Sequence, residues 1–127
     1  PCQVFYMTPM EASFVKYGIN SFLATKVLWF NQFKDLIDRY DSRYSVVANA
    51  VGYDKRIGNG HTKVPGFDGK KGFGGSCFPK DTAAIANFAS GSLTVLEEVM
   101  GANNLYRSQY MLDDREKEQN VSYNSTI

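Results

Sequence analysis

Apolar side chains recur at helical spacing through the first third of the chain. No proline interrupts the stretch from Pro9 to about Tyr40, and its apolar positions cover much of a helical circumference. The segment Thr8–Glu11, Thr-Pro-Met-Glu, begins it with an N-cap hydroxyl, proline at the first helical position and glutamate at the third. The pattern predicts one helix of roughly 30 residues, about 45 Å long.

A helix of this length carries more apolar surface than the rest of so short a chain can cover. Several exposed apolar groups would form a contiguous patch of the size that marks an interface. Two-fold pairing of two such helices would bury the patch in an isologous contact, so we expect a homodimer through this helix. The side chains concerned are Phe14, Phe22, Leu23, Val27, Leu28, Trp29, Phe30 and Phe33.

The remaining chain alternates short helical patterns with turn signals. Residues 52–78 are rich in glycine, lysine and aspartate, which predicts an irregular segment, and a loop this long in a small domain is usually functional or disordered. No strand signal and no internal repeat is found. The expected fold is all-α, a small helical bundle around one long helix. The other expected helices cover residues 43–51 (capped by Ser42), 79–88 and 92–113, within one domain over 1–113 and before a frayed, polar tail over 114–127.

Composition narrows the function class. The 127 residues suffice for one compact domain, and the net charge of +1 argues against a nucleic-acid module. No apolar run approaches the roughly 20 residues that cross a bilayer, so no membrane contact is expected. Two cysteines are too few for a disulfide framework or a zinc site, and the single histidine, His61, has no neighbouring ligand. We expect a cytoplasmic protein with free thiols and no metal.

Charged residues outside these patterns are expected to be solvated. Lys70 and Lys71 are interpreted as a loop tip, and the mixed charge run over residues 113–118 as the end of a helix or part of the tail.

One segment carries chemistry: residues 72–81, Gly-Phe-Gly-Gly-Ser-Cys-Phe-Pro-Lys-Asp. Its glycines allow close approach of the backbone to a ligand, and Pro79 begins a helix directly after Cys77. That position, with Lys80 nearby, favours the thiolate of a cysteine, and the free N–H groups of a helix start can stabilise an oxyanion. Asp81 lies one turn further on. The pattern favours a catalytic or redox cysteine, the alternative being a buried structural one.

These ten residues resemble the active-site signature of the UDP-glucose/GDP-mannose dehydrogenase family. Two further blocks resemble the family at nearly its spacing: residues 11–31, similar to its long central helix, and residues 54–58, Asp-Lys-Arg-Ile-Gly. The resemblance covers about residues 8 to 107 and implies the family's central, helical dimerisation domain.

The resemblance implies catalytic roles for four residues. Cys77 would be the nucleophile that forms a thiohemiacetal and then a thioester. Lys16 and Asn20, which share a helix face at spacing i and i+4, would stabilise the oxyanion and hold water or substrate. Asp81 would help to activate the water. The implied reaction oxidises the C6 alcohol of UDP-glucose to the carboxylate of UDP-glucuronate in two hydride transfers to NAD.

The resemblance also implies binding roles. Arg56 would reach the substrate across the dimer interface, Phe73 and Gly74 would line the sugar-nucleotide pocket, and Lys80 would lie near the nicotinamide. The form of residues 76–81 favours UDP-glucose over N-acetylated sugars.

The chain departs from the family in two respects. Residues 64–71, at the expected rim of the pocket, form a longer stretch than in the shortest family versions. No Gly-x-Gly-x-x-Gly follows a strand here, so we expect the N-terminal Rossmann domain and the C-terminal nucleotide-binding domain to be absent from this chain. The segment alone is then expected to be inactive. The alternative hypothesis is a stand-alone dimeric binding or assembly module that retains the fold without turnover.

Overall fold

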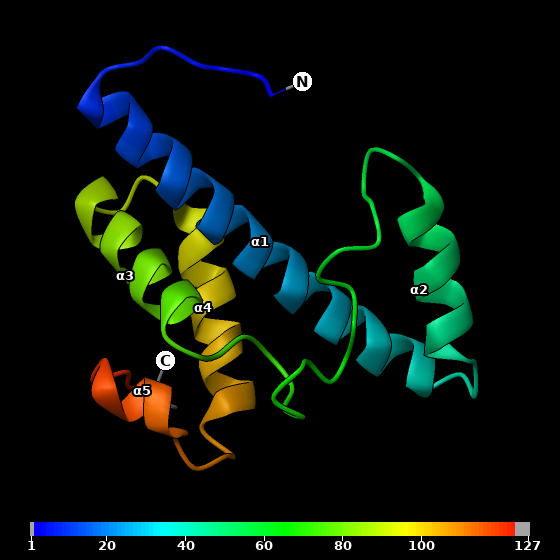
Figure 1. The fold of residues 1–127 in the computed structure, drawn as a ribbon. Helices are drawn as coiled ribbons and strands as arrows, with labels where there is room; N and C mark the ends of the chain where they lie inside the picture. Colours follow the sequence, from blue (N-terminus) through cyan, green and yellow to red (C-terminus); the bar gives the residue numbers. More distant parts are fainter. Residues whose placement is uncertain (1, 124–127) are drawn as a thin grey trace.

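The computed structural model describes residues 2–123, and these residues form helices and loops without a strand. The all-α fold class is confirmed. The helices are α1 (Pro9–Asp38), α2 (Tyr44–Tyr53), α3 (Cys77–Ala89), α4 (Thr94–Arg107) and α5 (Asp114–Glu118), as Figure 1 shows.

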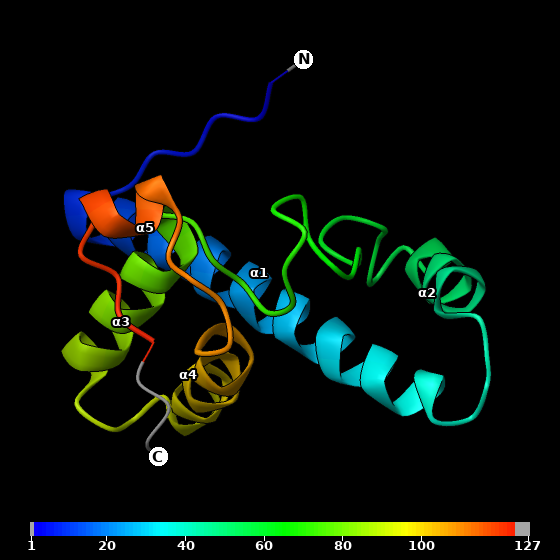
Figure 2. The ribbon, with the colours of Figure 1, turned by 90° about the horizontal axis from the view of Figure 1, so that it is seen from below.

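The long helix α1 is the axis of the molecule. Its predicted start is confirmed: the Glu11 N–H donates to Thr8 Oγ1 at 3.1 Å, and the Thr8 N–H donates to Glu11 Oε1 at 2.7 Å. Helices α3 and α4 pack against the N-terminal part of α1 and against each other, whereas α2 lies near its C-terminal end (Figures 1 and 2). None of the helices in the described part of the chain is long and apolar enough to cross a membrane.

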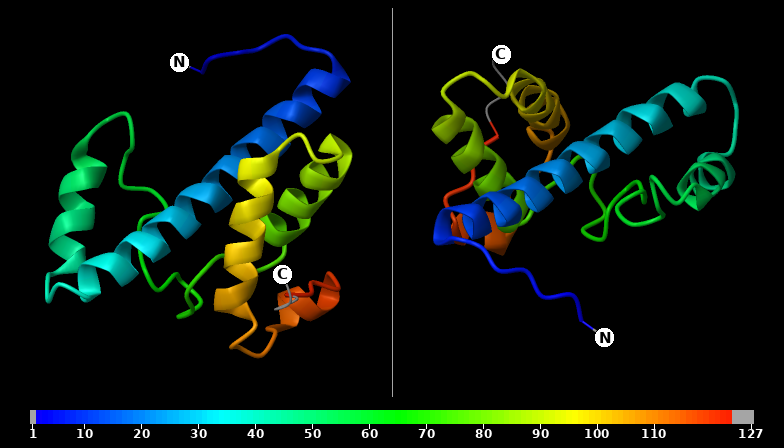
Figure 3. Two further views of the ribbon diagram at one scale, coloured as in Figure 1. Left: turned by 180° about the vertical axis from the view of Figure 1, so that it is seen from behind. Right: turned by 90° about the horizontal axis from the view of Figure 1, so that it is seen from above.

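The buried apolar side chains form two separate cores along α1. One core joins Phe30 and Ile37 of α1 to Tyr44 and Ala48 of α2, with Val64 from the following loop. The other core consists of Ala24, Leu28 and Phe73 and is covered by partly buried side chains of α4. The second core fixes the glycine-rich segment against α1. Seen from behind, in the left part of Figure 3, α3 and α4 lie side by side along the N-terminal half of α1.

The bounds of α2, α3 and α4 differ from the prediction. Arg43, not Ser42, is the N-cap of α2, and Ser42 Oγ instead donates to the Tyr40 carbonyl at 3.2 Å. Helix α3 includes Cys77 as its first residue. Helix α4 ends at Arg107 instead of Asp113, because Asp113 caps the separate helix α5.

The C-terminal segment is packed, so the prediction of a frayed tail is wrong for residues 114–123. The Glu116 N–H donates to Asp113 Oδ1 and the Asp113 N–H donates to Glu116 Oε1, both at 2.9 Å, which completes a capping box for α5. Glu116 is only 1% exposed, so the prediction of a fully solvated charge run is also wrong. Residues 124–127 lie outside the described residues.

The two loop lysines are partly exposed, and each also forms a contact within the fold. Lys70 Nζ donates to the Met111 carbonyl at 2.8 Å, and Lys71 Nζ pairs with Asp35 of α1. Both contacts join segments about 40 residues apart in the chain, which local sequence cannot reveal.

Candidate active site

A hydrogen bond between α1 and α3 forms the centre of the site. Asn20 Nδ2 donates to Asp81 Oδ2 at 2.6 Å. Asp81 is 3% exposed, and such a buried carboxylate requires a donor of this kind. Two of the predicted catalytic residues, 61 positions apart, are therefore in direct contact.

Cys77 stands at the first position of α3, one helical turn before Asp81. Gly75, two residues earlier, has φ +80°, and Ser76 is the N-cap. The thiol is free and exposed, so the alternative of a buried structural cysteine is wrong. A thiol here lies at the positive end of the helix dipole, where N–H groups without helical acceptors favour an anion.

The two predicted catalytic or cofactor-side lysines are exposed. Lys16 lies one turn before Asn20 on α1, with Nζ 5.4 Å from the centroid of the Tyr17 ring. Lys80 is on the first turns of α3. Within residues 2–123, no hydrogen bond or ion pair joins either lysine to the Asn20–Asp81 pair.

The glycine-rich segment lines a pocket. Phe73, 4% exposed, and Gly74 contribute to the wall of a cavity of about 230 Å³, together with Phe78, His61 and others. The His61 and Phe78 rings lie with their centroids 5.7 Å apart. The predicted pocket residues Phe73 and Gly74 thus share a cavity with the residue directly after Cys77.

Arg56 lies apart from this pocket, in the loop after α2. Its side chain is 90% exposed and binds Asp54 through two hydrogen bonds, of 3.0 and 2.7 Å. These bonds hold the pKa of Asp54 below its usual value and raise that of Arg56. Lys26 of α1 donates to the carbonyls of Ile57 and Gly58 at 2.7 and 3.1 Å, which attaches this loop to the long helix.

Sequence reasoning missed a set of buried polar residues behind the pocket. They are Asn31 of α1 and Asn103 and Arg107 of α4, and each is at most 2% exposed. The one available signal was their position: Asn103 and Arg107 follow the buried Leu96 at helical spacing, on a face that should be apolar.

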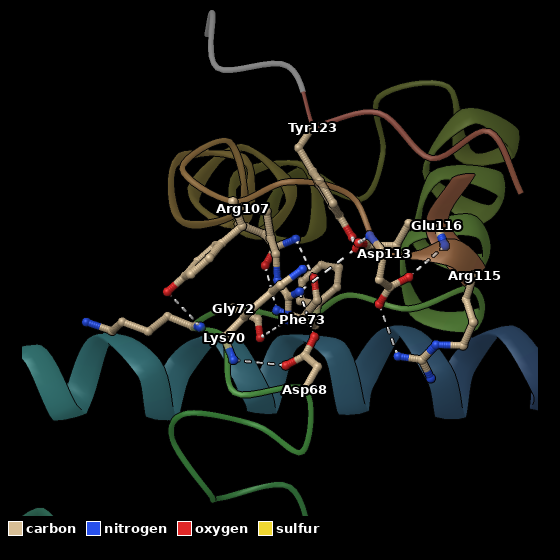
Figure 4. Close-up of polar contacts among 12 residues, drawn as sticks. Asp68, Lys70, Gly72, Phe73, Arg107, Asp113, Arg115, Glu116 and Tyr123 are labelled. Carbon is tan, nitrogen blue, oxygen red and sulfur yellow. Dashed lines mark hydrogen bonds and ion pairs between the residues drawn. The ribbon is translucent and has the colours of Figure 1, made fainter. Parts of the chain in front are cut away.

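Arg107 forms an ion pair with Asp68 at 2.7 Å (Figure 4). Burial raises the pKa of Asp68, but the hydrogen bonds from Arg107 and the Lys70 N–H lower it by more than burial raises it. The pKa of Asp68 therefore lies below its usual value. Such a shift stabilises the fold above the unfolded-state pKa, and the contribution is lost as the pH falls.

No group of three or more His, Cys, Asp or Glu side chains in residues 2–123 is arranged to hold a metal ion.

Comparison with known proteins places this site in context. Residues 10–105 match the model of the UDP-glucose/GDP-mannose dehydrogenase family, central domain. The chain is 39% identical over 100 residues to UDP-glucose 6-dehydrogenase TuaD of Bacillus subtilis, and this aligned segment covers 76% of the chain and 21% of the relative. It is 37% identical over 114 residues to YwqF of the same species, covering 87% and 24%, and 35% identical over 97 residues to the Rickettsia bellii enzyme, covering 74% and 21%. The chain spans less than a quarter of the length of these relatives.

Proposed function

Because this chain belongs to the UDP-glucose/GDP-mannose dehydrogenase family, we propose that it is the central domain of an NAD-dependent enzyme that oxidises UDP-glucose to UDP-glucuronate. One observation carries the proposal: an exposed thiol begins α3, and Asp81, which accepts a hydrogen bond from Asn20, lies one turn further along this helix. A nucleophile, a hydrogen-bond donor and a carboxylate are the groups that acyl chemistry at an aldehyde carbon needs.

Cys77 would hold the intermediate between the two oxidations. Its thiolate adds to the C6 aldehyde carbon, a C–S bond forms, and the carbonyl oxygen becomes an alkoxide. The Lys16 ammonium and the remaining Asn20 N–H would stabilise that alkoxide. Loss of hydride from C6 restores the carbonyl as a thioester.

Hydrolysis would then release the acid. Water adds to the thioester carbon while Asp81, held in place by the hydrogen bond from Asn20, accepts a proton from it. The C–S bond breaks, Cys77 leaves as thiolate, and the sugar departs as carboxylate. The thiolate is a good leaving group, which explains the use of cysteine instead of serine.

The described residues do not form the dinucleotide-binding fold that holds NAD, the proposed hydride acceptor. A dinucleotide fold needs a parallel sheet with a glycine-rich turn, and no strand occurs in residues 2–123. We propose that NAD is bound mainly outside this segment, with Lys80 at its edge, and we assign to this chain only the steps at Cys77.

The binding roles extend the proposal. Phe73 and Gly74 would contact the sugar nucleotide through the cavity that they line. Arg56, highly exposed and outside that cavity, would serve the neighbouring subunit's site. We further propose residues 1–113 as the central catalytic and dimerisation domain and a cytoplasmic location for its free thiols.

The proposal is tested by the reduction of NAD in the presence of UDP-glucose. The purified 127-residue protein is expected to show no turnover. A chimera that carries residues 10–105 in place of the matching segment of Bacillus subtilis TuaD should restore it, with two NAD reduced for each acid formed. A folded chimera without turnover would favour the stand-alone binding module.

We also propose a homodimer through α1. Phe14, Phe22 and Trp29 of the predicted interface are about half exposed or more, at 49%, 69% and 53%, whereas Leu28 and Phe30 of the same set are buried within the chain. A patch of exposed aromatic groups on one helix is typical of an interface.

Sedimentation at micromolar concentration should therefore give about twice the chain mass of 14.2 kDa. Phe22→Asp should shift the protein towards monomer, whereas Phe67→Asp, which changes a fully exposed loop phenylalanine, should not. A monomeric unsubstituted protein would rule out the dimer and the cross-subunit role of Arg56.

A further inference from the structure

Side chains, not backbone, satisfy the polar groups of Gly72 and Phe73. The Gly72 N–H donates to Asn31 Oδ1 at 2.9 Å, and the Gly72 carbonyl accepts from Arg107 Nη2 at 3.0 Å. The Phe73 N–H donates to Asn103 Oδ1 at 2.7 Å, and its carbonyl accepts from Asn103 Nδ2 at 3.0 Å. Asn103 therefore pairs with Phe73 as a neighbouring strand would.

This arrangement leaves no space beside the loop. Gly72 has φ +78°, and a Cβ on it would lie 2.5 Å from Asn103 Oδ1. A Cβ on Gly74 would overlap the Arg107 guanidinium and would lie 2.8 Å from Glu116 Oε2. The glycines allow the close approach, but they also leave the free loop with many conformations, which the contacts from α1 and α4 must restrict.

Arg107 is itself fixed from two sides. Asp68 Oδ2 accepts its Nη1 hydrogen bond at 2.7 Å, and Glu116 Oε2 lies 3.9 Å from the same nitrogen. The Tyr123 hydroxyl donates to Glu116 Oε2 at 2.5 Å, and burial, followed by this bond, raises the pKa of Tyr123. Figure 4 shows these groups surrounding Gly72 and Phe73.

We propose that Asn103 and Arg107 are positioning residues for the site around Cys77. Phe73 precedes Cys77 by four residues and lines the cavity beside it. By fixing the backbone at Gly72 and Phe73, the two side chains set the direction in which the chain enters α3, and with it the thiol. This inference rests on the proposed role of Cys77 as nucleophile. It assigns a function to α4, a helix whose described side chains form no hydrogen bond with the thiol.

The test compares the labelling of two thiols in one molecule. Asn103→Leu keeps nearly the same volume but removes both hydrogen bonds to Phe73. Iodoacetamide labelling at neutral pH, followed by peptide mapping, gives the rate at Cys77 relative to the exposed Cys2. We expect that ratio to fall several-fold, because a loosened loop lets the first turn of α3 fray and removes its anion-stabilising N–H groups.

Asn104→Leu is the matched control. It makes the same change one position along α4, at a side chain that forms none of the hydrogen bonds to Gly72 and Phe73, and should leave the ratio unchanged. A merely structural Asn103 would lower the unfolding temperature of the variant but leave the ratio in folded protein as it was. That result, with circular dichroism confirming the fold, would overturn the proposal.

If Asn103→Leu does not fold, Arg107→Lys provides the second test. It keeps a cation beside Asp68 and Glu116 but removes the guanidinium group that also donates to the Gly72 carbonyl, and the labelling ratio should again fall. Failure of this inference can be told apart from failure of the proposed function. Turnover that survives Cys77→Ala would remove the nucleophile, whereas an unchanged labelling ratio would remove only the positioning role.

Discussion

Replacement of Cys77 by alanine is expected to abolish acid formation in the chimera that restores turnover. The thiol forms the covalent intermediate in the proposed mechanism, and it lies exposed at the start of α3. Removal of the catalytic serine of a serine protease, which also forms a covalent intermediate, lowers kcat on the order of 10⁶-fold. The readout is NAD reduction together with direct detection of UDP-glucuronate.

The control for this experiment is Val95→Ala in the same chimera. It truncates a side chain of α4 that is 72% exposed and should leave the rate unchanged. Cys77→Ser should retain partial chemistry and accumulate an ester, since an alkoxide is a poorer leaving group than a thiolate. Undiminished acid formation by Cys77→Ala would exclude the covalent mechanism.

Replacement of Arg107 by methionine is expected to lower the free energy of unfolding by about 3–5 kcal/mol. The side chains of Arg107 and Glu116 are 2% and 1% exposed, so removal of the cation leaves Glu116 buried without a counter-charge and Asp68 without its partner. The Gly72 carbonyl also loses its donor. Urea unfolding monitored by circular dichroism measures the change.

Arg56→Met is the matched control, because it breaks an ion pair whose arginine side chain is 90% exposed. Its effect should stay below about 1 kcal/mol. Adding Glu116→Gln to Arg107→Met should recover part of the loss, since the uncompensated charge is then removed. Equal effects of the two arginine substitutions would mean that burial does not determine the strength of the Arg107 network.

The parts of the fold that sequence predicted are those specified by neighbouring residues. The start of α1 follows from Thr8 and Glu11, which bond each other, and a helix after the glycine-rich segment follows from Pro79, although α3 begins two residues earlier, at Cys77. The family resemblance implied that Asn20 and Asp81 belong to one site, but it did not predict their direct hydrogen bond.

The parts that sequence could not predict depend on distant partners. Glu116 belongs to a run of charged residues that is typical of a solvated surface, and only the fold brings it to Arg107 and Tyr123. The sequence around Lys71 is typical of a loop tip, and only the fold shows that its ammonium group pairs with Asp35 of α1. A charged group is buried only where a partner compensates it, and nothing in the local sequence identifies that partner.

The division of the buried side chains into two cores has a consequence for local unfolding. Among the helices, α2 packs against α1 alone, whereas α3 and α4 share the core that holds Phe73. Amide hydrogens of α2 can therefore exchange with solvent when the core between α1 and α2 opens and the core around Phe73 stays closed. The two cores then behave as separate cooperative units. The loop that carries Arg56 can gain freedom in this way while the thiol of Cys77 keeps its place.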